Sequence, residues 1–463
     1  MNLFSVAARR LPGRGLAVLG AMIVIAVASQ FVAASSRPLP PAATVSSGPA
    51  LDRGLAGVDQ VSPGDSGLDR IRADIAFWSG RAARQPKDFV SATEWAGVEI
   101  ELARATGDLA AWERAERATA QALAANPGFG SAVGYRGTVL LALHRFVEAR
   151  DMARAILAER PADPFALSTV GDASLDLGAY PDARAAYQSL DQVAHSAASM
   201  VRLGRMSYLD GHAAAAVRLT REAMDAAVTE GAEGERLAWY RCQLGNLLAA
   251  TGDPAAAETA FAAALSADPH SWLARVGLAR MLAVRGRLDE AIARLGEAID
   301  IVPLPDSLAR RSDLYELRGG TGDAKRAADD RATVEAIARL AGANGAVYDR
   351  TLAVYLANHG LHPDRAVTIT ERELTVRTDV DGYDAEAWAL LSAGRAAEAE
   401  AAMNKAMALG TRDARLLYHA GMIAAALHDG QRARVLLTSS LDLEASFDPL
   451  QAQRARETLA ALP

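Results

Sequence analysis

A pattern of small and apolar residues predicts pairs of packed helices along most of this chain. The clearest pair lies between Trp239 and Pro269, where residues at helical spacing form one face of a first helix and one face of a second. These residues are Leu244, Gly245, Leu248, Ala257, Phe261 and Ala264. A small residue at Gly245 lets the second helix approach, and Ala257 faces it and is small for the same reason. Phe261 then fills the space between neighbouring pairs.

The residues between the two helices are typical of a tight turn. Gly252 suits the left-handed backbone conformation just after a helix C-terminus. Asp253 is a favoured N-cap residue, and Pro254 suits the first position of the next helix. Pro269 cannot continue a helix, so the second helix ends there.

The same pattern recurs at a nearly constant step. Pro303 follows Pro269 after 34 residues, and the residue types between them repeat. The small residue of the Gly245 position recurs at steps of 33 or 34 within two series, Gly137, Gly171 and Gly204, and Ala353, Ala387 and Gly421. The step from Gly204 to Gly245 is 41, which predicts a longer second helix and loop near residues 229–234. The unit at residues 304–341 is the least regular.

This spacing resembles the tetratricopeptide repeat (TPR), over about residues 92–445 and in about ten units. Segments around Trp388 and Tyr418 look like a broad group of uncharacterised exported bacterial TPR proteins. The resemblance implies an all-α fold, a TPR-type α-solenoid in which helix–turn–helix repeats form a right-handed superhelix. It also implies that the concave face, lined by the first helices, binds peptides or protein segments.

The N-terminus carries an apolar run that predicts export. Residues 16–34 are uncharged and follow Arg9, Arg10 and Arg14. The most apolar 13 residues fit the core of a signal peptide, and the whole run could just span a bilayer. A cleaved signal peptide and a single membrane anchor at residues 1–34 therefore both stay open. Either one leaves the rest of the chain on the extracytoplasmic side of the cytoplasmic membrane, anchored or secreted into the periplasm.

The remaining chain divides into a linker and the repeat domain. Residues 35–66 are rich in Pro, Ser, Gly and Ala and predict a flexible linker. Residues 67–462 form the predicted helical repeat domain, which begins with a helix from Leu68. A helix over residues 448–462 is polar on one side and is expected to cap the open end of the stack.

The composition and motifs argue against several classes of protein. The chain has 49 basic and 56 acidic residues, a net charge of -7, and no basic stripe with interleaved aromatics, so nucleic acid is not an expected partner. The sequence lacks HExxH, P-loop, GxSxG and CxxC motifs. Gly128, Gly130 and Gly134 have no predicted strand before them, so they predict no dinucleotide site. We therefore expect no enzyme activity, no catalytic residue and no cofactor.

Histidine and cysteine leave two further alternatives. His359, His362 and His419 could hold a metal ion across neighbouring repeats, although His359 and His362 are more simply read as solvated turn residues, and we expect no metal site. Cys242 is the sole cysteine, so no intramolecular disulfide can form. A buried, small apolar residue is favoured at Cys242 over a reactive or intermolecularly bonded thiol.

The register of the repeats points six side chains toward the concave face as candidate partner contacts. They are Asp172, Arg205, Tyr208, Asn246, Arg280 and Trp388. The simpler interpretation of each is an ordinary solvated residue. The sequence thus favours a non-enzymatic protein–protein interaction scaffold that assists assembly of a cell-envelope complex. An alternative is an accessory binding protein of a membrane transport or metal-handling system.

Overall fold

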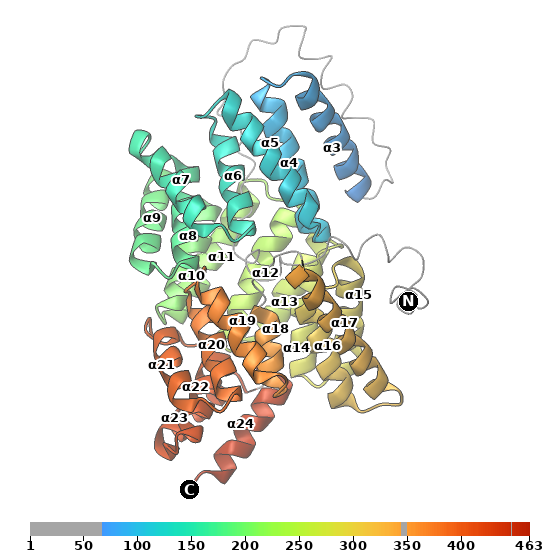
Figure 1. Cartoon of the computed structure of the whole chain (residues 1–463), viewed down its shortest axis with the longest axis vertical. Coiled ribbons are helices and arrows are strands. Elements are labelled where there is room, and N and C mark those ends of the chain that lie inside the picture. The colour runs from blue at the N-terminus through green and yellow to red at the C-terminus, as the bar shows by residue number, and fades with distance from the viewer. Residues whose placement is uncertain (1–66, 344–349, 446) are drawn as a thin grey trace.

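The computed structural model describes residues 67–343, 350–445 and 447–463, so the predicted signal peptide or anchor and the linker lie outside the described residues. The described chain forms 22 helices, α3 to α24, and no strand (Figure 1). Their bounds are α3 Gly67–Arg84, α4 Phe89–Thr106, α5 Leu109–Ala125, α6 Gly130–Ala142, α7 Phe146–Glu159, α8 Pro164–Asp176, α9 Tyr180–Val193, α10 Ala197–Leu209, α11 Ala213–Thr229, α12 Gly234–Ala250, α13 Pro254–Ala267, α14 Trp272–Val284, α15 Leu288–Ile301, α16 Pro305–Arg318, α17 Asp323–Ala343, α18 Arg350–Asn358, α19 Pro363–Leu374, α20 Val380–Ser392, α21 Ala396–Ala406, α22 Ala414–Ala426, α23 Gly430–Leu443 and α24 Pro449–Ala461.

The helices pack as consecutive pairs, from α4 with α5 to α22 with α23. Single helices, α3 and α24, lie at the two ends of the described stack. This arrangement confirms the predicted α-solenoid. In the described part of the chain, no helix combines the length and the apolar character needed to cross a membrane.

The small residues permit the close packing that the sequence predicts. Phe261 of α13 is fully buried, and a Cβ built on Gly245 would lie 2.8 Å from its ring. A Cβ on Gly277 of α14, in the next repeat, would clash with the same ring. Phe261 therefore packs between two repeats at places where only glycine leaves room, and this contact continues the core from one repeat to the next.

The irregular units differ from the others in helix length. α11 has 17 residues and is followed by a left-handed turn at Gly231, which accounts for the longer step before Gly245. α17 has 21 residues and is the longest helix in the described chain. Gly252 and Gly286 have φ angles of 87° and 73°, as their places after helix C-termini predict.

The superhelix returns to contact itself, which the sequence did not indicate. The hydroxyl of Thr378 donates to the carbonyl of Leu177 at 2.8 Å, and the hydroxyl of Thr411 donates to the carbonyl of Leu209 at 2.6 Å. These bonds join residues 201 and 202 positions apart, so the end of α8 touches the start of α20 six pairs further along. In Figure 1 the green helices α8 to α10 accordingly lie beside the orange helices α20 to α22.

Glycines of left-handed conformation make these contacts possible. Gly178, Gly211 and Gly252 sit in the turns after α8, α10 and α12, and all have positive φ. A Cβ built on each would clash with a backbone carbonyl oxygen of the later superhelical turn. These oxygens belong to Thr378, Gly410 and Leu443, respectively. The two turns of the superhelix thus approach backbone to backbone at three consecutive repeats.

A buried ion network joins the same two turns. The guanidinium of Arg377 lies 2.6 Å from Asp176 of α8 and 3.2 Å from Asp379. Arg350 contacts Asp379 and Glu373, each at 2.7 Å. Burial raises the pKa of Asp379, but the two arginines outweigh burial and hold that pKa at about 2. Since breaking a buried ion pair by removing one partner costs about 3–5 kcal/mol, this network ties α8 firmly to the segment before α20.

We predict that Gly211→Ala loosens the contact between the turns. The added Cβ would lie 2.5 Å from the carbonyl oxygen of Gly410, in addition to the strain of a φ of 77°. Gly394→Ala is the matched control, because Gly394 has a φ of 74° and nothing within 4 Å of a built Cβ. Both variants should lose about 1–2 kcal/mol of stability from strain. Only Gly211→Ala should speed amide hydrogen exchange in residues 405–416. Equal exchange in the two variants would show that the turns do not depend on this contact.

Candidate functional site

A cavity with a volume of about 410 Å³ lies inside the superhelix. Its walls come from α8, α10, α12, α14, α16, α18, α20 and α22, which are the first helices of eight consecutive pairs, with a few residues from neighbouring elements. The last helix, α24, lines one end. There the side chains of Gln451 and Arg454 donate to Asn358 of α18, at 2.8 and 2.7 Å. The contacts between the superhelical turns therefore enclose part of the concave face.

Four of the six side chains predicted to face the groove line this cavity. Arg205, Asn246 and Arg280 occupy equivalent positions on α10, α12 and α14, and Tyr208 lies one helical turn after Arg205. The hydroxyl of Tyr208 donates to Asp413 at 2.7 Å, across the two turns of the superhelix. Nη1 of Arg280 donates to Oδ1 of Asn246 at 3.4 Å. Their role in binding a partner stays a prediction.

The other two candidates lie among structural contacts and not on the cavity wall. Asp172 is 8% exposed and accepts hydrogen bonds from Arg202 of the next repeat and from Tyr187. It joins α8, α9 and α10. Trp388 is 6% exposed, and its ring stacks on His419 with centroids 4.1 Å apart. The register places both residues on a first helix, but neighbouring side chains cover them.

The cavity wall is rich in charge of both signs. The described residues that line it include six arginines, Arg205, Arg280, Arg310, Arg350, Arg377 and Arg415. They also include nine acidic residues, Asp176, Asp306, Asp313, Asp379, Asp381, Asp384, Asp413, Glu444 and Asp448. Nine carboxylates against six guanidinium groups leave the wall acidic when all are ionised. The cavity therefore favours a partner with positive charge.

Most of these charges form ion pairs within the chain, but Glu444 and Arg280 form none among the described residues, and Arg280 only hydrogen-bonds to Asn246. Glu444 is 8% exposed, and its Oε1 accepts no hydrogen bond from the described residues. Burial raises the pKa of Glu444 to about 7, and Arg280 offsets this only in part, while Asp413 and Asp448 add to it. Among the described residues, Arg280 forms no ion pair and donates a hydrogen bond to Asn246. These two groups can both interact with a molecule that enters the cavity.

The histidines predicted as a possible metal site do not come together. His419 is fully buried and contacts Asp384, with Nδ1 2.7 Å from Oδ1. Burial raises the pKa of Asp384, but His419 and Arg415 outweigh burial and hold that pKa below its usual value. His362 is the left-handed N-cap residue of α19. The three-histidine arrangement was wrong, because each ring has a different neighbourhood.

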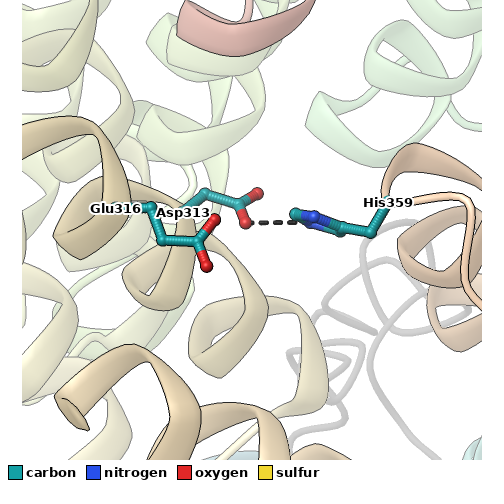
Figure 2. Close-up of side chains that lie close together, drawn as sticks. All are labelled: Asp313, Glu316 and His359. Carbon is teal, nitrogen blue, oxygen red and sulfur yellow. Dashed lines mark ion pairs between the residues drawn. The ribbon is translucent and has the colours of Figure 1, made fainter. Parts of the chain in front are cut away.

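His359 instead lies opposite two carboxylates of α16 (Figure 2). Nε2 of His359 is 2.9 Å from Oδ1 of Asp313. One ligand atom from each of Asp313, Glu316 and His359 lies within 4.8 Å of the others. This donor set suits a divalent transition metal, although Glu316 also contacts Arg331 in an ion pair that a metal would have to displace.

Cys242 lies inside α12 and is 1% exposed. Burial raises the pKa of its thiol to about 12. A protonated, buried thiol packs as a small apolar side chain, as the sequence favoured.

Comparison with known families supports the interpretation of the repeats. The family model for the tetratricopeptide repeat matches residues 100–164 and 242–304, which span parts of α4 to α8 and α12 to α15. The chain therefore contains tetratricopeptide repeats. No curated protein matches the sequence of this TPR protein.

Several solved structures resemble this TPR protein at low sequence identity. A tetratricopeptide repeat protein from Parabacteroides merdae is 12% identical, with a TM-score of 0.39, and the alignment covers 54% of this chain and 91% of the other. Yeast Tom70 is 12% identical, with a TM-score of 0.33, and 89% and 94% of the two chains are covered. YrrB, described as a TPR protein with an unusual peptide-binding site, is 18% identical, with a TM-score of 0.28 and coverages of 40% and 92%.

Repeat register could not have found Glu444, Asp413 or Asp448. All three lie in the loops before α22 and α24, outside the periodic positions of the helices. Asp413 and Asp448 are N-cap residues, a signal that the sequence does carry. Their place in the cavity depends on the return of the superhelix onto itself.

We predict that Glu444→Gln removes a pH-dependent loss of stability. The pKa of Glu444 is raised in the folded chain. Its contribution to the free energy of unfolding is therefore present at low pH and is lost as pH rises through about 7. With an unfolded pKa near 4.5, the loss between pH 5 and pH 8 is about 2.5 kcal/mol. Relative to wild type, Glu444→Gln should therefore gain stability on going from pH 5 to pH 8.

The measurement is urea unfolding at both pH values, with Glu457→Gln as the control because Glu457 is exposed on α24. A difference between Glu444→Gln and wild type that stays constant with pH would mean that Glu444 titrates normally.

Proposed function

We propose that this TPR protein is a non-enzymatic scaffold that holds a segment of another protein inside the superhelix. The single observation that supports this most is the cavity lined by the first helices, in which Oε1 of the buried Glu444 has no hydrogen-bond partner among the described residues. Polar groups held in fixed positions on a concave wall are typical of a site for specific binding.

The scaffold acts, in this proposal, on the extracytoplasmic side of the cytoplasmic membrane and assists assembly of a cell-envelope complex. This part rests on the sequence of residues 1–66, where an apolar run after three arginines is followed by a Pro-rich linker. The linker would set the reach between membrane and repeat domain.

Affinity capture of the full-length protein from gently cross-linked native membranes, followed by mass spectrometry, tests this function. We expect a small, reproducible set of envelope proteins that is lost when the repeats are deleted. Recovery of the protein alone would contradict the scaffold.

We predict that Arg280→Ala weakens binding of a captured partner about tenfold or more. A lost hydrogen bond to a charged group is worth about 1.5–3 kcal/mol, and each 1.4 kcal/mol is a factor of ten. Arg218→Ala is the control, since Arg218 lies on α11 in an exposed ion pair with Glu222. The measurement is the dissociation constant by isothermal titration calorimetry. If both variants bind as wild type does, the partner does not use the cavity.

A second candidate function is an accessory binding protein of a membrane transport or metal-handling system. The cluster of Asp313, Glu316 and His359 is the observation that favours it. Zinc bound at this cluster would stabilise the folded chain by mass action.

We predict for this candidate that zinc raises the melting temperature of wild type by roughly 2 °C or more, and that His359→Ala abolishes the rise. His270→Ala is the control, because His270 is exposed at the start of α14 and belongs to no such cluster. Scanning calorimetry of the repeat domain with and without zinc makes the measurement. An unchanged melting temperature in wild type with zinc, and likewise with nickel, would exclude the metal site.

A further inference from the structure

Glu444 is held at one end of the cavity by the fold itself. It directly follows α23, and its backbone N–H donates to the carbonyl of Ser440 at 3.1 Å. The carbonyl of the preceding residue, Leu443, packs against Gly252 of the earlier superhelical turn. The side chain that this geometry directs to the cavity wall is more than nine-tenths buried, yet Oε1 has no hydrogen-bond donor among the described residues. Leaving a buried carboxylate without a donor is costly, so a donor from outside the chain is favoured there.

The charges around Glu444 are mostly negative. Asp413 at the start of α22 and Asp448 at the start of α24 both act on it electrostatically, and α14 contributes Arg280. Oδ1 of Asp413 and Oδ1 of Asp448 each accept backbone N–H groups and cap their helices. Oδ2 of Asp413 also accepts from the hydroxyl of Tyr208, and Arg415 and Arg310 act on Asp413 and Asp448, respectively. Glu444 itself is acted on by two carboxylates and one guanidinium, so its surroundings are acidic.

The other arginines near this end are committed elsewhere. Nε of Arg310 donates to Asp306 at 2.7 Å. Arg415 lies 3.6 Å from both Asp381 and Asp384. Arg280 itself donates to Asn246 and acts on Glu444 electrostatically without forming an ion pair with it. Among the described residues, Arg280 therefore acts on Glu444 without forming an ion pair with it, and no other cation offsets its charge.

We propose that Glu444, Asp413 and Asp448 form a subsite for a lysine or arginine side chain of the protein segment that the cavity binds. This inference rests on the proposed function and names the chemistry of its partner. An ammonium or guanidinium group supplies both the positive charge and the N–H donors that Glu444 lacks. A neutral donor such as a serine hydroxyl would satisfy one oxygen but leave the charge of the three carboxylates unbalanced.

Selection from a random peptide library tests the subsite without a known partner. Acetylated and amidated peptides of random sequence are passed over the immobilised repeat-containing chain at pH 8, where the Glu444 carboxylate is ionised, and the retained peptides are sequenced. Wild type, Glu444→Gln and Glu457→Gln are compared, the last as a matched change on the exposed face of α24. Circular dichroism and melting temperature verify that each variant is folded.

We expect wild type and Glu457→Gln to enrich lysine or arginine at one position at least fivefold over the input library, and Glu444→Gln to lose that enrichment. If all three proteins retain peptides but Glu444→Gln shows the same preference as wild type, the subsite is wrong while the peptide-binding function stands. Enrichment of acidic or neutral residues at that position overturns the subsite in the same way. If wild type retains no peptide above background, the proposed function and the subsite both fail.

Discussion

The close contact between successive turns of the superhelix is the constraint on which this structure depends. An open solenoid presents its concave face to water, where charged side chains interact weakly. Here three glycines of positive φ let the superhelical turns meet backbone to backbone, and the concave face becomes the wall of a partly enclosed cavity. Charges on this wall are partly removed from water, and each must therefore be paired within the chain or with a bound molecule.

The pairing is uneven in a way that separates structural from binding residues. The network of Asp176, Arg377, Asp379 and Arg350 brings opposite charges into ion pairs and joins α8 to the segment before α20. Buried pairs of this kind add little net stability, because desolvation offsets their attraction, but they fix which surfaces meet. Glu444 lacks such a partner although it belongs to the same wall. In the proposed function, a bound molecule supplies the ion-pair partner that Glu444 lacks among the described residues.

The sequence predicted the repeats well, because their determinants are local. The small residue at Gly245, the left-handed Gly252 and the apolar Phe261 act within one helix pair and its neighbour, and a step of 34 residues is visible without a structure. The same register placed Arg205, Asn246 and Arg280 on one wall. It could not show that Asp172 is covered by Arg202, since that depends on the rotamer of a side chain in the next repeat.

Closure of the superhelix could not be predicted from the sequence, for a different reason. Whether residue 211 meets residue 410 depends on the sum of small rotations over six repeats, and the irregular units at α11 and α17 alter that sum. The sequence period gives the step from one repeat to the next, but it does not give the pitch of the superhelix. Loop residues such as Glu444 acquire their place in the cavity only through that pitch.

Closure also sets a cost for binding. A protein segment can reach Glu444 only where the cavity communicates with solvent or after the turns separate, and separation breaks the bonds of Thr378 and Thr411. If the closed form is the stable one, the partner's affinity is reduced by the fraction of chains that are open, and it is restored as the bound segment's own contacts replace those that were lost. The glycine contacts and the subsite are therefore energetically coupled: weakening the contact between the turns makes the cavity easier to reach and, at the same time, less preorganised for the segment that it receives.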